Sequence, residues 1–527
     1  MKRKLLVTAL ALACASQAEA TCFVNQAASG LNDGSSWTDA YVDLQSAINS
    51  TACDEIWVAE GVYKPGASGD DTAAFNLRPG VALYGGFAGS EASVADRNLS
   101  LHRSVLSGDI DNDDAHAATG QIDETAADIS GDNSMYLMKL DGTVAGSPIT
   151  SSTVVDGFTL TGATYSALLC QGSYTSSECS PNLRNLTFAG NSSAREGAAI
   201  LIEASYGGAA RPTISSSLFK GNTSKDGGAI FVVALERGIS DLNLDDVIFD
   251  SNVATHRGGA IYVDAEFDGD QNTLEINHTH FTNNSSSAGG GALYAEINDS
   301  GILEMDVTGS TFDSNNGLYG GAIYAITHNA QLVGKFINST FYENGAVYEG
   351  GAISLSNLFS PGAGVHLFNN VTFKGNHAVG DGMVDGTGGA IEIYNYPAAP
   401  GAGVSLTNTI LSGDLATSPT DGPEIHNSYG YSVVTIDHSI VTGSCPDAST
   451  CTNVSSADPL LGPLGYFFSR TPVMRPGIGG SAIDAGDDAT CEANDQRGFA
   501  RPQGAHCDIG AIEMRMPSDD ISFPSGF

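Results

Sequence analysis

Residues 249–261 read FDSNVATHRGGAI, and this pattern decides the fold because it recurs along the chain. A Phe is followed three residues later by Asn, and then by a small-residue tetrapeptide, usually Gly-Gly-Ala-Ile. Successive Phe positions lie 29 to 32 residues apart. The seven pairs are Phe188 with Asn191, Phe219 with Asn222, Phe249 with Asn252, Phe281 with Asn284, Phe312 with Asn315, Phe341 with Asn344 and Phe373 with Asn376.

The length of the repeat favours a parallel β-helix. Apolar and polar residues alternate in short stretches between the motifs, and alternation with period two indicates strands. A propeller blade would need about 40–45 residues and a leucine-rich repeat about 20–29. We therefore predict an all-β solenoid of about a dozen coils of about 30 residues, in which successive coils pair in parallel at about 4.8 Å.

The repeated residues then have structural roles. The Phe positions predict an inward column of stacked rings, and the Ile positions predict an apolar column on another wall. The glycines allow a tight turn and a close approach of backbones. The Asn residues lie where the chain leaves the strand, where they tolerate left-handed backbone and can form a side-chain ladder along the axis.

The paired motifs FxxN and GGA[ILVY] resemble the repeats of bacterial polymorphic outer-membrane proteins over residues 185–395. This resemblance implies a single right-handed parallel β-helix of the pectin-lyase-like superfamily. The stretches 481–486 (SAIDAG), 495–498 (DQRG) and 507–513 (CDIGAIE) are similar to the choice-of-anchor Q module, which typically ends exported bacterial β-helix proteins. Together the two resemblances imply an extracellular or outer-membrane-associated, cell-surface protein.

We expect five segments. Residues 1–20 are predicted to be a secretory signal peptide, with a basic start, a short apolar core and an Ala-x-Ala cleavage site. Cleavage before Cys14, as in a lipoprotein, is the alternative. Residues 21–150 form an N-terminal cap with irregular coils, 151–455 the repeat region, 456–514 the C-terminal module and 515–527 a tail. No later apolar run is long enough to form a transmembrane segment.

A capping helix is expected near the start of the solenoid. The open edge of a β-helix recruits other strands unless it is covered. Tyr41, Leu44 and Ile48 have the spacing of an amphipathic helix, and Thr38 or Asp39 can serve as its N-cap.

Eight cysteines follow the predicted signal peptide, and an even number in an exported chain suggests disulfides. Zinc is disfavoured because no Cys-x-x-Cys motif is present. Proximity in sequence favours four local pairs, which are Cys22–Cys53, Cys170–Cys179, Cys445–Cys451 and Cys491–Cys507.

The charge balance argues against polyanionic partners. The 527-residue chain has a formal net charge of -38, although only 16% of its residues are charged. Such a surface repels nucleic acid and anionic membranes and attracts divalent cations.

Two acidic clusters are candidate polar sites. Asp109, Asp111, Asp113 and Asp114 lie in one loop, and hard oxygen ligands at such spacing suit Ca²⁺. Solvated loop carboxylates are the alternative. For Asp484, Asp487, Asp488 and Asp495, an ion-pair network with Arg497 and Arg501 is favoured over a metal.

No catalytic constellation stands out. Lys220 and Lys374 follow a repeat Phe, but the same position holds unrelated residues in other coils. The histidines at 256, 278, 280 and 328 are interpreted as scattered surface residues. We therefore expect a non-enzymatic, adhesin-like rod that binds an extracellular polysaccharide or a surface protein. The alternative is a polysaccharide lyase or glycoside hydrolase.

Overall fold

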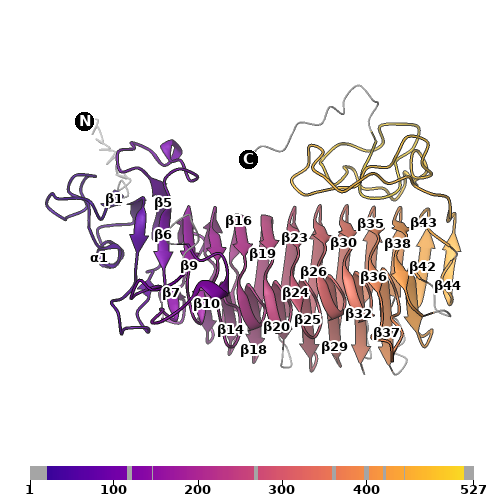
Figure 1. Ribbon diagram of the computed structural model, residues 1–527, viewed down its shortest axis with the longest axis horizontal. Helices are drawn as coiled ribbons and strands as arrows, with labels where there is room; N and C mark the ends of the chain where they lie inside the picture. Colours follow the sequence, from indigo (N-terminus) through magenta and orange to yellow (C-terminus); the bar gives the residue numbers. More distant parts are fainter. Residues whose placement is uncertain are drawn as a thin grey trace, which may run out of the picture.

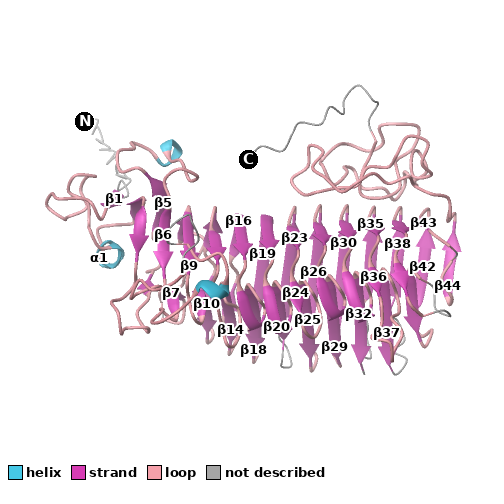
Figure 2. Cartoon of the chain, in the orientation of Figure 1, coloured by secondary structure: helices cyan, strands magenta, loops and turns pink. Residues whose placement is uncertain are grey.

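The protein is a long parallel β-solenoid of about 13 turns of about 31 residues, which confirms the predicted fold class (Figures 1 and 2). The computed structural model describes residues 21–115, 122–144, 146–265, 271–358, 364–396, 403–418, 423–443 and 445–514. The predicted signal peptide and tail lie outside these residues. No helix in the described part of the chain is long and apolar enough to cross a membrane.

The coils form three sheets, the third of which runs only from Thr223 to Ala416, and all strand pairs between coils are parallel. The second sheet has 11 strands: β4 (Phe75–Asn76), β7 (Tyr136–Asp141), β10 (Ser166–Ser173), β14 (Ile200–Ser205), β18 (Ile230–Leu235), β21 (Ile261–Ala265), β25 (Leu293–Asn298), β29 (Ile323–His328), β33 (Ile353–Leu358), β37 (Ile391–Tyr396) and β41 (Ile425–Ser428). The third sheet has seven: β17 (Thr223–Asp226), β20 (Val253–Arg257), β24 (Ser285–Ser286), β28 (Asn316–Tyr319), β32 (Gly345–Glu349), β36 (His377–Ala378) and β40 (Leu415–Ala416).

The first sheet has 26 strands and carries the repeat Phe residues. Its strands are β1 (Thr21–Val24), β2 (Glu55–Ala59), β3 (Gly61–Tyr63), β5 (Ala82–Phe87), β6 (Ser104–Ser107), β8 (Val154–Asp156), β9 (Phe158–Thr161), β11 (Glu178–Cys179), β12 (Asn182–Arg184), β13 (Thr187–Ala189), β15 (Ala209–Ala210), β16 (Thr213–Lys220), β19 (Ile239–Asp250), β22 (Gln271–Asn277), β23 (His280–Thr282), β26 (Ile302–Thr308), β27 (Thr311–Asp313), β30 (Gln331–Ile337), β31 (Thr340–Tyr342), β34 (Val365–Asn369), β35 (Thr372–Lys374), β38 (Gly403–Thr407), β39 (Ile410–Ser412), β42 (Val433–Asp437), β43 (Ile440–Val441) and β44 (Ser449–Thr452).

The seven repeat Phe side chains are fully buried and stacked in one column. Neighbouring ring centroids from Phe188 to Phe373 are 4.6 to 4.9 Å apart, and the rings are within 13° of parallel. This spacing is the distance between hydrogen-bonded strands. The rings therefore stack because the backbone ladder places them in register.

The repeat Asn side chains form a buried ladder beside the Phe column. The carboxamide of Asn252 donates to Asn284 Oδ1 at 2.9 Å and to the carbonyl of Phe219 at 2.9 Å. Its own Oδ1 accepts from the side chain of Asn222 at 2.9 Å and from the backbone N–H of Asn222 at 3.1 Å. Each interior Asn thus satisfies its buried amide through both neighbouring coils.

The ladder begins at Asn191, where the pattern of bonds differs. The Asn191 carboxamide donates to Asn222 Oδ1 at 2.9 Å, as the later rungs do, but its second bond goes to the carbonyl of Leu160 at 3.1 Å. No repeat Asn precedes it, and its Oδ1 accepts from the backbone N–H of Ala163 at 3.1 Å. An irregular early coil therefore supplies the partners that a repeat coil would otherwise provide.

The ladder continues without a break to Asn376. Asn315 donates to Asn344 Oδ1 at 2.9 Å, and Asn344 donates to Asn376 Oδ1 at 2.9 Å. Each of these two side chains also donates to a Phe carbonyl of the preceding coil, at 3.0 Å for Asn315 and 2.9 Å for Asn344. The rungs from Asn222 to Asn344 thus all use the same two kinds of bond.

The sequence predicted left-handed backbone at the repeat Asn residues, but the structure has it at the residue before each of them. None of the seven Asn residues has a positive φ angle, whereas the residue before each of them does. The preceding residue has φ of 60° at Gly190 before Asn191, 57° at Ser314 before Asn315 and 49° at Glu343 before Asn344. Because the preceding residue makes the turn, the Asn side chain points inward and can reach the next coil.

The paired glycines before the second sheet are required by geometry. The first adopts left-handed φ angles, such as 64° at Gly258 and 62° at Gly290. A Cβ on the second would lie 1.9 Å from a backbone oxygen of the next coil at Gly259 and 2.1 Å at Gly291. Any side chain at Gly259 or Gly291 would therefore force neighbouring coils apart, whereas the first repeat has Ala198 at the equivalent position.

The N-terminal helix is present, but the predicted start was wrong. Helix α1 spans Leu44–Asn49, and its N-cap is Asp43, which accepts from the backbone N–H of Ser46 at 2.7 Å. Asp39 instead accepts from the Leu31 backbone and the Ser36 hydroxyl, because residues 30–41 fold as a loop. The helix still buries Leu44, Ala47 and Ile48 in the core at the start of the rod.

The structure contains four disulfides, and they join the cysteine pairs that sequence proximity favours. Cys22–Cys53 ties the first strand to the chain after α1, and Cys170–Cys179 lies within an early coil. Cys445–Cys451 lies in the last coil, and Cys491–Cys507 lies in the C-terminal module.

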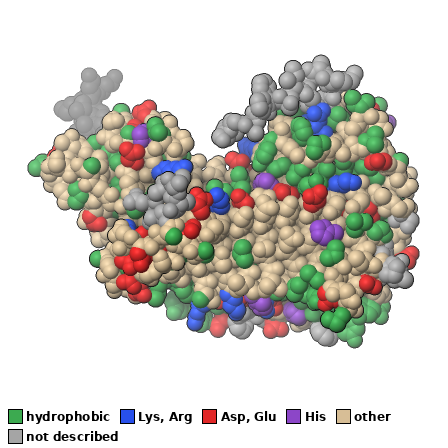
Figure 3. Space-filling view, viewed as in Figure 1, with side chains coloured by type: hydrophobic (Ala, Val, Ile, Leu, Met, Phe, Trp, Pro, Cys, Tyr) green, Lys and Arg blue, Asp and Glu red, His purple; other side chains and the backbone are tan. Residues whose placement is uncertain are grey.

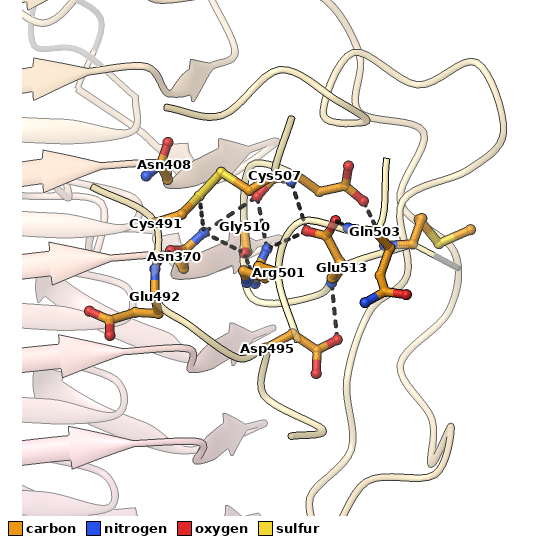
Figure 4. Close-up of polar contacts among 12 residues, drawn as sticks. Asn370, Asn408, Cys491, Glu492, Asp495, Arg501, Gln503, Cys507, Gly510 and Glu513 are labelled. Atoms are coloured by element: carbon orange, nitrogen blue, oxygen red, sulfur yellow. Dashed lines mark hydrogen bonds and ion pairs between the residues drawn. A yellow bond between two sulfur atoms is a disulfide. The ribbon is translucent and has the colours of Figure 1, made fainter. Parts of the chain in front are cut away.

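The C-terminal module, residues 456–514, folds back along the side of the solenoid instead of extending it (Figure 1). Arg501 is buried at its centre, where it donates to the carbonyls of Asp508 at 2.9 Å and Gly510 at 2.8 Å (Figure 4). The same guanidinium pairs with Glu513 at 3.2 Å. These contacts organise a segment whose described residues form isolated β-bridges but no strand.

The acidic residues of this module form only part of the expected ion-pair network. Asp495 pairs with Arg497 at 2.9 Å, but Arg501 takes Glu513 as its carboxylate partner. The remaining carboxylates bind other groups: Asp484 accepts from the His506 backbone, Asp487 from the Thr490 hydroxyl, and Asp488 contacts the His506 ring. Asp484, Asp487 and Asp488 therefore contact groups other than the two arginines.

The Asn ladder ends on a buried pair of acids. Asn376 donates to Asp414 Oδ1 at 2.7 Å, so a carboxylate takes the next position of the ladder. Glu424 lies beside Asp414, and both side chains are almost completely buried. Burial, reinforced by the charge of Asp414, raises the pKa of Glu424 to about 11. Glu424 is therefore protonated at neutral pH.

Phe281→Asp should destabilise the protein by about 4 kcal/mol or more, because it places an unpaired charge in the middle of the ring stack. Phe281→Leu should cost far less, since it keeps an apolar side chain. The measurement is the urea midpoint of unfolding by circular dichroism. Tyr206→Asp, at an exposed aromatic position, is the control and should stay close to wild type. Equal midpoints for Phe281→Asp and Tyr206→Asp would contradict the buried column.

Glu424→Gln should stabilise the protein increasingly as the pH rises. The folded state keeps a proton on Glu424 that the unfolded chain releases near pH 4.5, so wild-type stability falls between pH 4.5 and about 11. Glutamine keeps a neutral donor and removes this loss. Melting temperatures between pH 5 and 9 should diverge upward for Glu424→Gln, while the exposed Glu304→Gln follows wild type. Parallel pH profiles for Glu424→Gln and wild type would show that Glu424 is not protonated in the fold.

Candidate functional site: a notch on the first sheet

Two outward columns run side by side along the first sheet. The turn column consists of residues with left-handed φ angles of 41 to 62°: Asn185, Ser216, Asp246, His278, Gly309, Asn338, Asn370, Asn408 and His438. The strand column lies two residues further along each coil: Thr187, Leu218, Ile248, His280, Thr311, Thr340, Thr372, Ile410 and Ile440.

The C-terminal module covers the second half of both columns. Thr311 donates to the carbonyl of Pro472 at 2.6 Å, and Thr340 donates to Gln496 Oε1 at 2.7 Å. Asn370 donates to the carbonyl of Asp508 at 3.3 Å (Figure 4). These contacts close the columns from Gly309 onward.

An N-terminal segment covers the other end. Ile122 packs with Val105 and Ala189 in a small apolar cluster, and Lys220 forms an ion pair with Glu124 at 2.6 Å. The notch is the part between the two covers, with a floor formed by Asn185, Thr187, Ser216, Leu218, Asp246, Ile248, His278 and His280. It contains two hollows of about 280 and 360 Å³ that share Leu99 and Leu218 in their linings. Figure 3 shows the recess along the upper edge of the molecule, between the N-terminal part and the C-terminal module, in which the notch lies.

The notch floor combines hydrogen-bonding groups with apolar side chains. Amide, hydroxyl and carboxylate groups occupy the turn column. Leu218 and Ile248 supply apolar surface in the strand column, and Ile248 is 39% exposed. Arg103 and Lys220 lie at one side and Arg470 at the other. This surface can contact a ligand that has both apolar faces and many hydroxyl groups.

A chain of three polar side chains lies at the C-terminal side of the notch. His280 Nε2 contacts Asp313 Oδ1, and Thr282 also donates to this carboxylate at 3.0 Å. The Tyr466 hydroxyl of the C-terminal module lies 3.5 Å from His280 Nδ1. Burial and the nearby charge of Asp313 raise the pKa of Tyr466.

A second link to the C-terminal module lies beside this chain. His278 Nδ1 is 3.0 Å from Asp245, and Arg470 pairs with the same carboxylate at 3.6 Å. The wall of the notch is therefore held to its floor by Tyr466 and Arg470.

The interpretation of all four histidines as scattered was wrong for two of them. His278 and His280 lie together in the notch, and Lys220 lies at its opposite side. His256 contacts Asp226 on the third sheet, and His328 ends a strand of the second sheet. The sequence signal was present, since His278 and His280 are two residues apart and lie just before the repeat residue Phe281.

The acidic loop brings together three of its four predicted carboxylates. Asp109, Asp111 and Asp113 can each place one oxygen within 4.8 Å of the others. Asp114 instead accepts from Asn133 at 2.7 Å and from the Ser130 backbone at 2.6 Å.

The carboxylates of the loop repel one another, although Lys64 Nζ lies 3.9 Å from Asp109 Oδ2. Partial desolvation and the charge of Asp111 raise the pKa of Asp113, and burial raises that of Asp114. Among the described residues, Asp111 Oδ1 is buried and has no hydrogen-bond partner. A divalent cation would offset this repulsion and bind the unpaired oxygen.

Known proteins share the repeat. The Chlamydia polymorphic membrane protein repeat matches residues 216–233, 246–264 and 278–296, which include most of the notch floor. The chain is 28% identical over 265 residues to the probable autotransporter YfaL of Escherichia coli (strain K12), covering 43% of this chain and 20% of the relative. It is 29% identical over 144 residues to the probable outer membrane protein PmpA of Chlamydia trachomatis serovar D, covering 26% of this chain and 15% of the relative.

The protein is thus a β-solenoid with polymorphic-membrane-protein repeats, distantly related to an autotransporter and an outer membrane protein. It spans about a fifth or less of the length of these relatives. The choice-of-anchor Q resemblance of the C-terminal module stays a prediction.

We propose that Ca²⁺ binds the loop at Asp109, Asp111 and Asp113. Calcium should raise the melting temperature of the wild type and leave that of Asp111→Asn/Asp113→Asn unchanged. This variant spares Asp109 and Asp114, which hold the loop backbone. The exposed pair Asp299→Asn/Asp306→Asn makes the same change in net charge and should respond as wild type. No calcium shift in the wild type would remove the metal proposal.

Proposed function

We propose that this protein is exported, remains at the cell surface, and binds an extracellular polysaccharide across the notch. The single observation that carries the proposal is the open floor between the two covering segments. In the part of the chain that the structure describes, both outward columns are uncovered there and present hydroxyl, amide and apolar groups from successive coils. Export is supported by the signal-like start of the sequence, and the surface location by the names of the two relatives.

A polysaccharide suits the notch for two reasons. An extended chain can contact several coils at once, so weak contacts add up along the floor. Sugar rings carry apolar C–H faces and hydroxyl edges, which match Leu218 and Ile248 beside the polar turn column. The mixed charges of Lys220, Arg470, Glu124 and Asp246 give the notch no single strong sign.

A second candidate function is cleavage of the bound polysaccharide. The arrangement of Tyr466, His280 and Asp313 favours it, because an imidazole held between a carboxylate and a phenol can move a proton. Cleavage would appear as new reducing ends or as absorbance at 235 nm, and it should fall in His280→Ala. If the protein binds the polysaccharide but releases neither product, the result supports a function in binding without catalysis.

Ile248→Arg should weaken polysaccharide binding at least tenfold, because it places a long charged side chain on the notch floor. Val253→Arg is a matched control, since Val253 lies in the same coil on the third sheet and is 36% exposed, against 39% for Ile248. Co-sedimentation with a panel of neutral and acidic polysaccharides measures the affinity. Equal affinities of the two variants for a polysaccharide that wild type binds would place its site elsewhere. No binding of any polysaccharide by wild type would contradict the proposed function and leave a surface protein as the partner to test.

A further inference from the structure

A second exposed surface lies away from the notch, near the end of the rod where β37 is found (Figure 1). It is formed by strands β29, β37 and β41 of the second sheet and β28 and β32 of the third, with adjoining turns. We call it the tyrosine patch, and its residues are Tyr319, Tyr324, Tyr348, Glu349, Tyr394, Tyr396, Tyr429 and Tyr431.

The tyrosine rings contact one another across coils and sheets. Tyr319 lies 5.5 Å from Tyr324 and 5.5 Å from Tyr348, measured between ring centroids. Tyr429 lies 5.6 Å from Tyr394 and 6.0 Å from Tyr431. The patch therefore contains two groups of packed rings, one around Tyr319 and one around Tyr429.

Several of these rings are open to solvent. Tyr396 is 45% exposed, Tyr429 59% and Tyr431 48%. A cluster of exposed aromatic rings is costly to maintain in water and marks an interaction site more often than a lone aromatic residue does.

A carboxyl group lies among these rings. Burial, together with the charge of Glu392, raises the pKa of Glu349 to about 7. Glu392 is fully buried, where it accepts from Ser428 at 2.7 Å and contacts His426 at 2.8 Å. Glu349 can thus present an O–H donor below neutral pH, with phenol hydroxyls around it.

The composition of the patch points to an uncharged, hydroxyl-rich ligand. The tyrosine patch contains no Lys or Arg, and the charged groups that act on Glu349 are Glu392 and His426. Tyr has an apolar ring and a polar tip, so a row of tyrosines can contact a sugar ring on its C–H face and at its hydroxyl edge. An anionic ligand would meet the carboxyl groups of Glu349 and Glu392, and also that of Asp381, to which the Tyr348 hydroxyl donates at 3.0 Å.

We propose that the tyrosine patch is a second carbohydrate site, which binds a neutral oligosaccharide independently of the notch. The sugar rings lie on Tyr429 and Tyr431, and the protonated Glu349 carboxyl donates a hydrogen bond to a sugar hydroxyl. The site would give the rod a second contact on a different face, so that one long glycan or two chains could be held at once.

Calorimetric titration of the full chain with cellohexaose, xylohexaose and chitohexaose tests this proposal. Tyr429→Ala/Tyr431→Ala should lower the affinity for the oligosaccharide that binds by at least tenfold. The control is Tyr174→Ala/Tyr206→Ala, which removes another exposed pair of stacked rings, 5.6 Å apart on early coils. The control should stay within twofold of wild type. No binding of any of the three probes by wild type, or equal losses in both variants, would overturn the proposal.

The pH dependence of the same titration tests the role of Glu349. Wild-type affinity should fall as the pH rises from 6 to 8, because Glu349 loses its proton near pH 7. Glu349→Gln keeps a neutral donor and should bind equally at both pH values. The notch variant Ile248→Arg should bind the oligosaccharide as wild type does, so failure of the notch and failure of the patch are distinguishable. Parallel pH profiles for wild type and Glu349→Gln would remove the hydrogen bond from the proposal.

Discussion

One buried asparagine in each of the seven repeat coils, from Asn191 to Asn376, holds these coils in register. Its carboxamide bonds the Asn of the next coil and a Phe carbonyl of the preceding coil, while its oxygen accepts from the coil before. These bonds can form only when successive coils are separated by the same distance along the solenoid axis. If one coil were displaced relative to its neighbours, its buried amide groups would lose their partners, at a cost of about 1–3 kcal/mol for each unsatisfied group. The stacked Phe rings and the paired glycines fit the same spacing, so the three features constrain one another.

Because the inward positions are constrained, variation is confined to the outward columns. The two outward columns of the first sheet are straight rows of residues whose identity changes from coil to coil. Their ends are covered, by residues near Ile122 at one end and by the C-terminal module at the other. The extent of the notch is therefore set by the positions at which the two covering segments end. A similar argument applies to the tyrosine patch, which lies on outward positions of other sheets.

The sequence predicts what repeats and what lies close along the chain. The period identifies the β-helix, the Phe and Asn positions indicate its columns, and neighbouring cysteines suggest the local disulfides. The helix start was missed because Asp39 bonds within a loop whose backbone contacts are not periodic. The notch could not be predicted, because Tyr466 meets His280 across 186 residues of sequence. The tyrosine patch could not be predicted either, because its residues come from two different sheets. The spacing of residues along one strand does not show how two sheets lie relative to each other.

Native-state hydrogen exchange at the Asn ladder tests the central claim most directly. The backbone N–H groups of Asn222, Asn252 and Asn284 each donate to the carboxamide of the next coil. The account predicts that these amides exchange only through global unfolding, together with the most protected strand amides of the same coils. Exchange by local opening, faster than that of the flanking strands, would show that the asparagine ladder does not hold the coils in register.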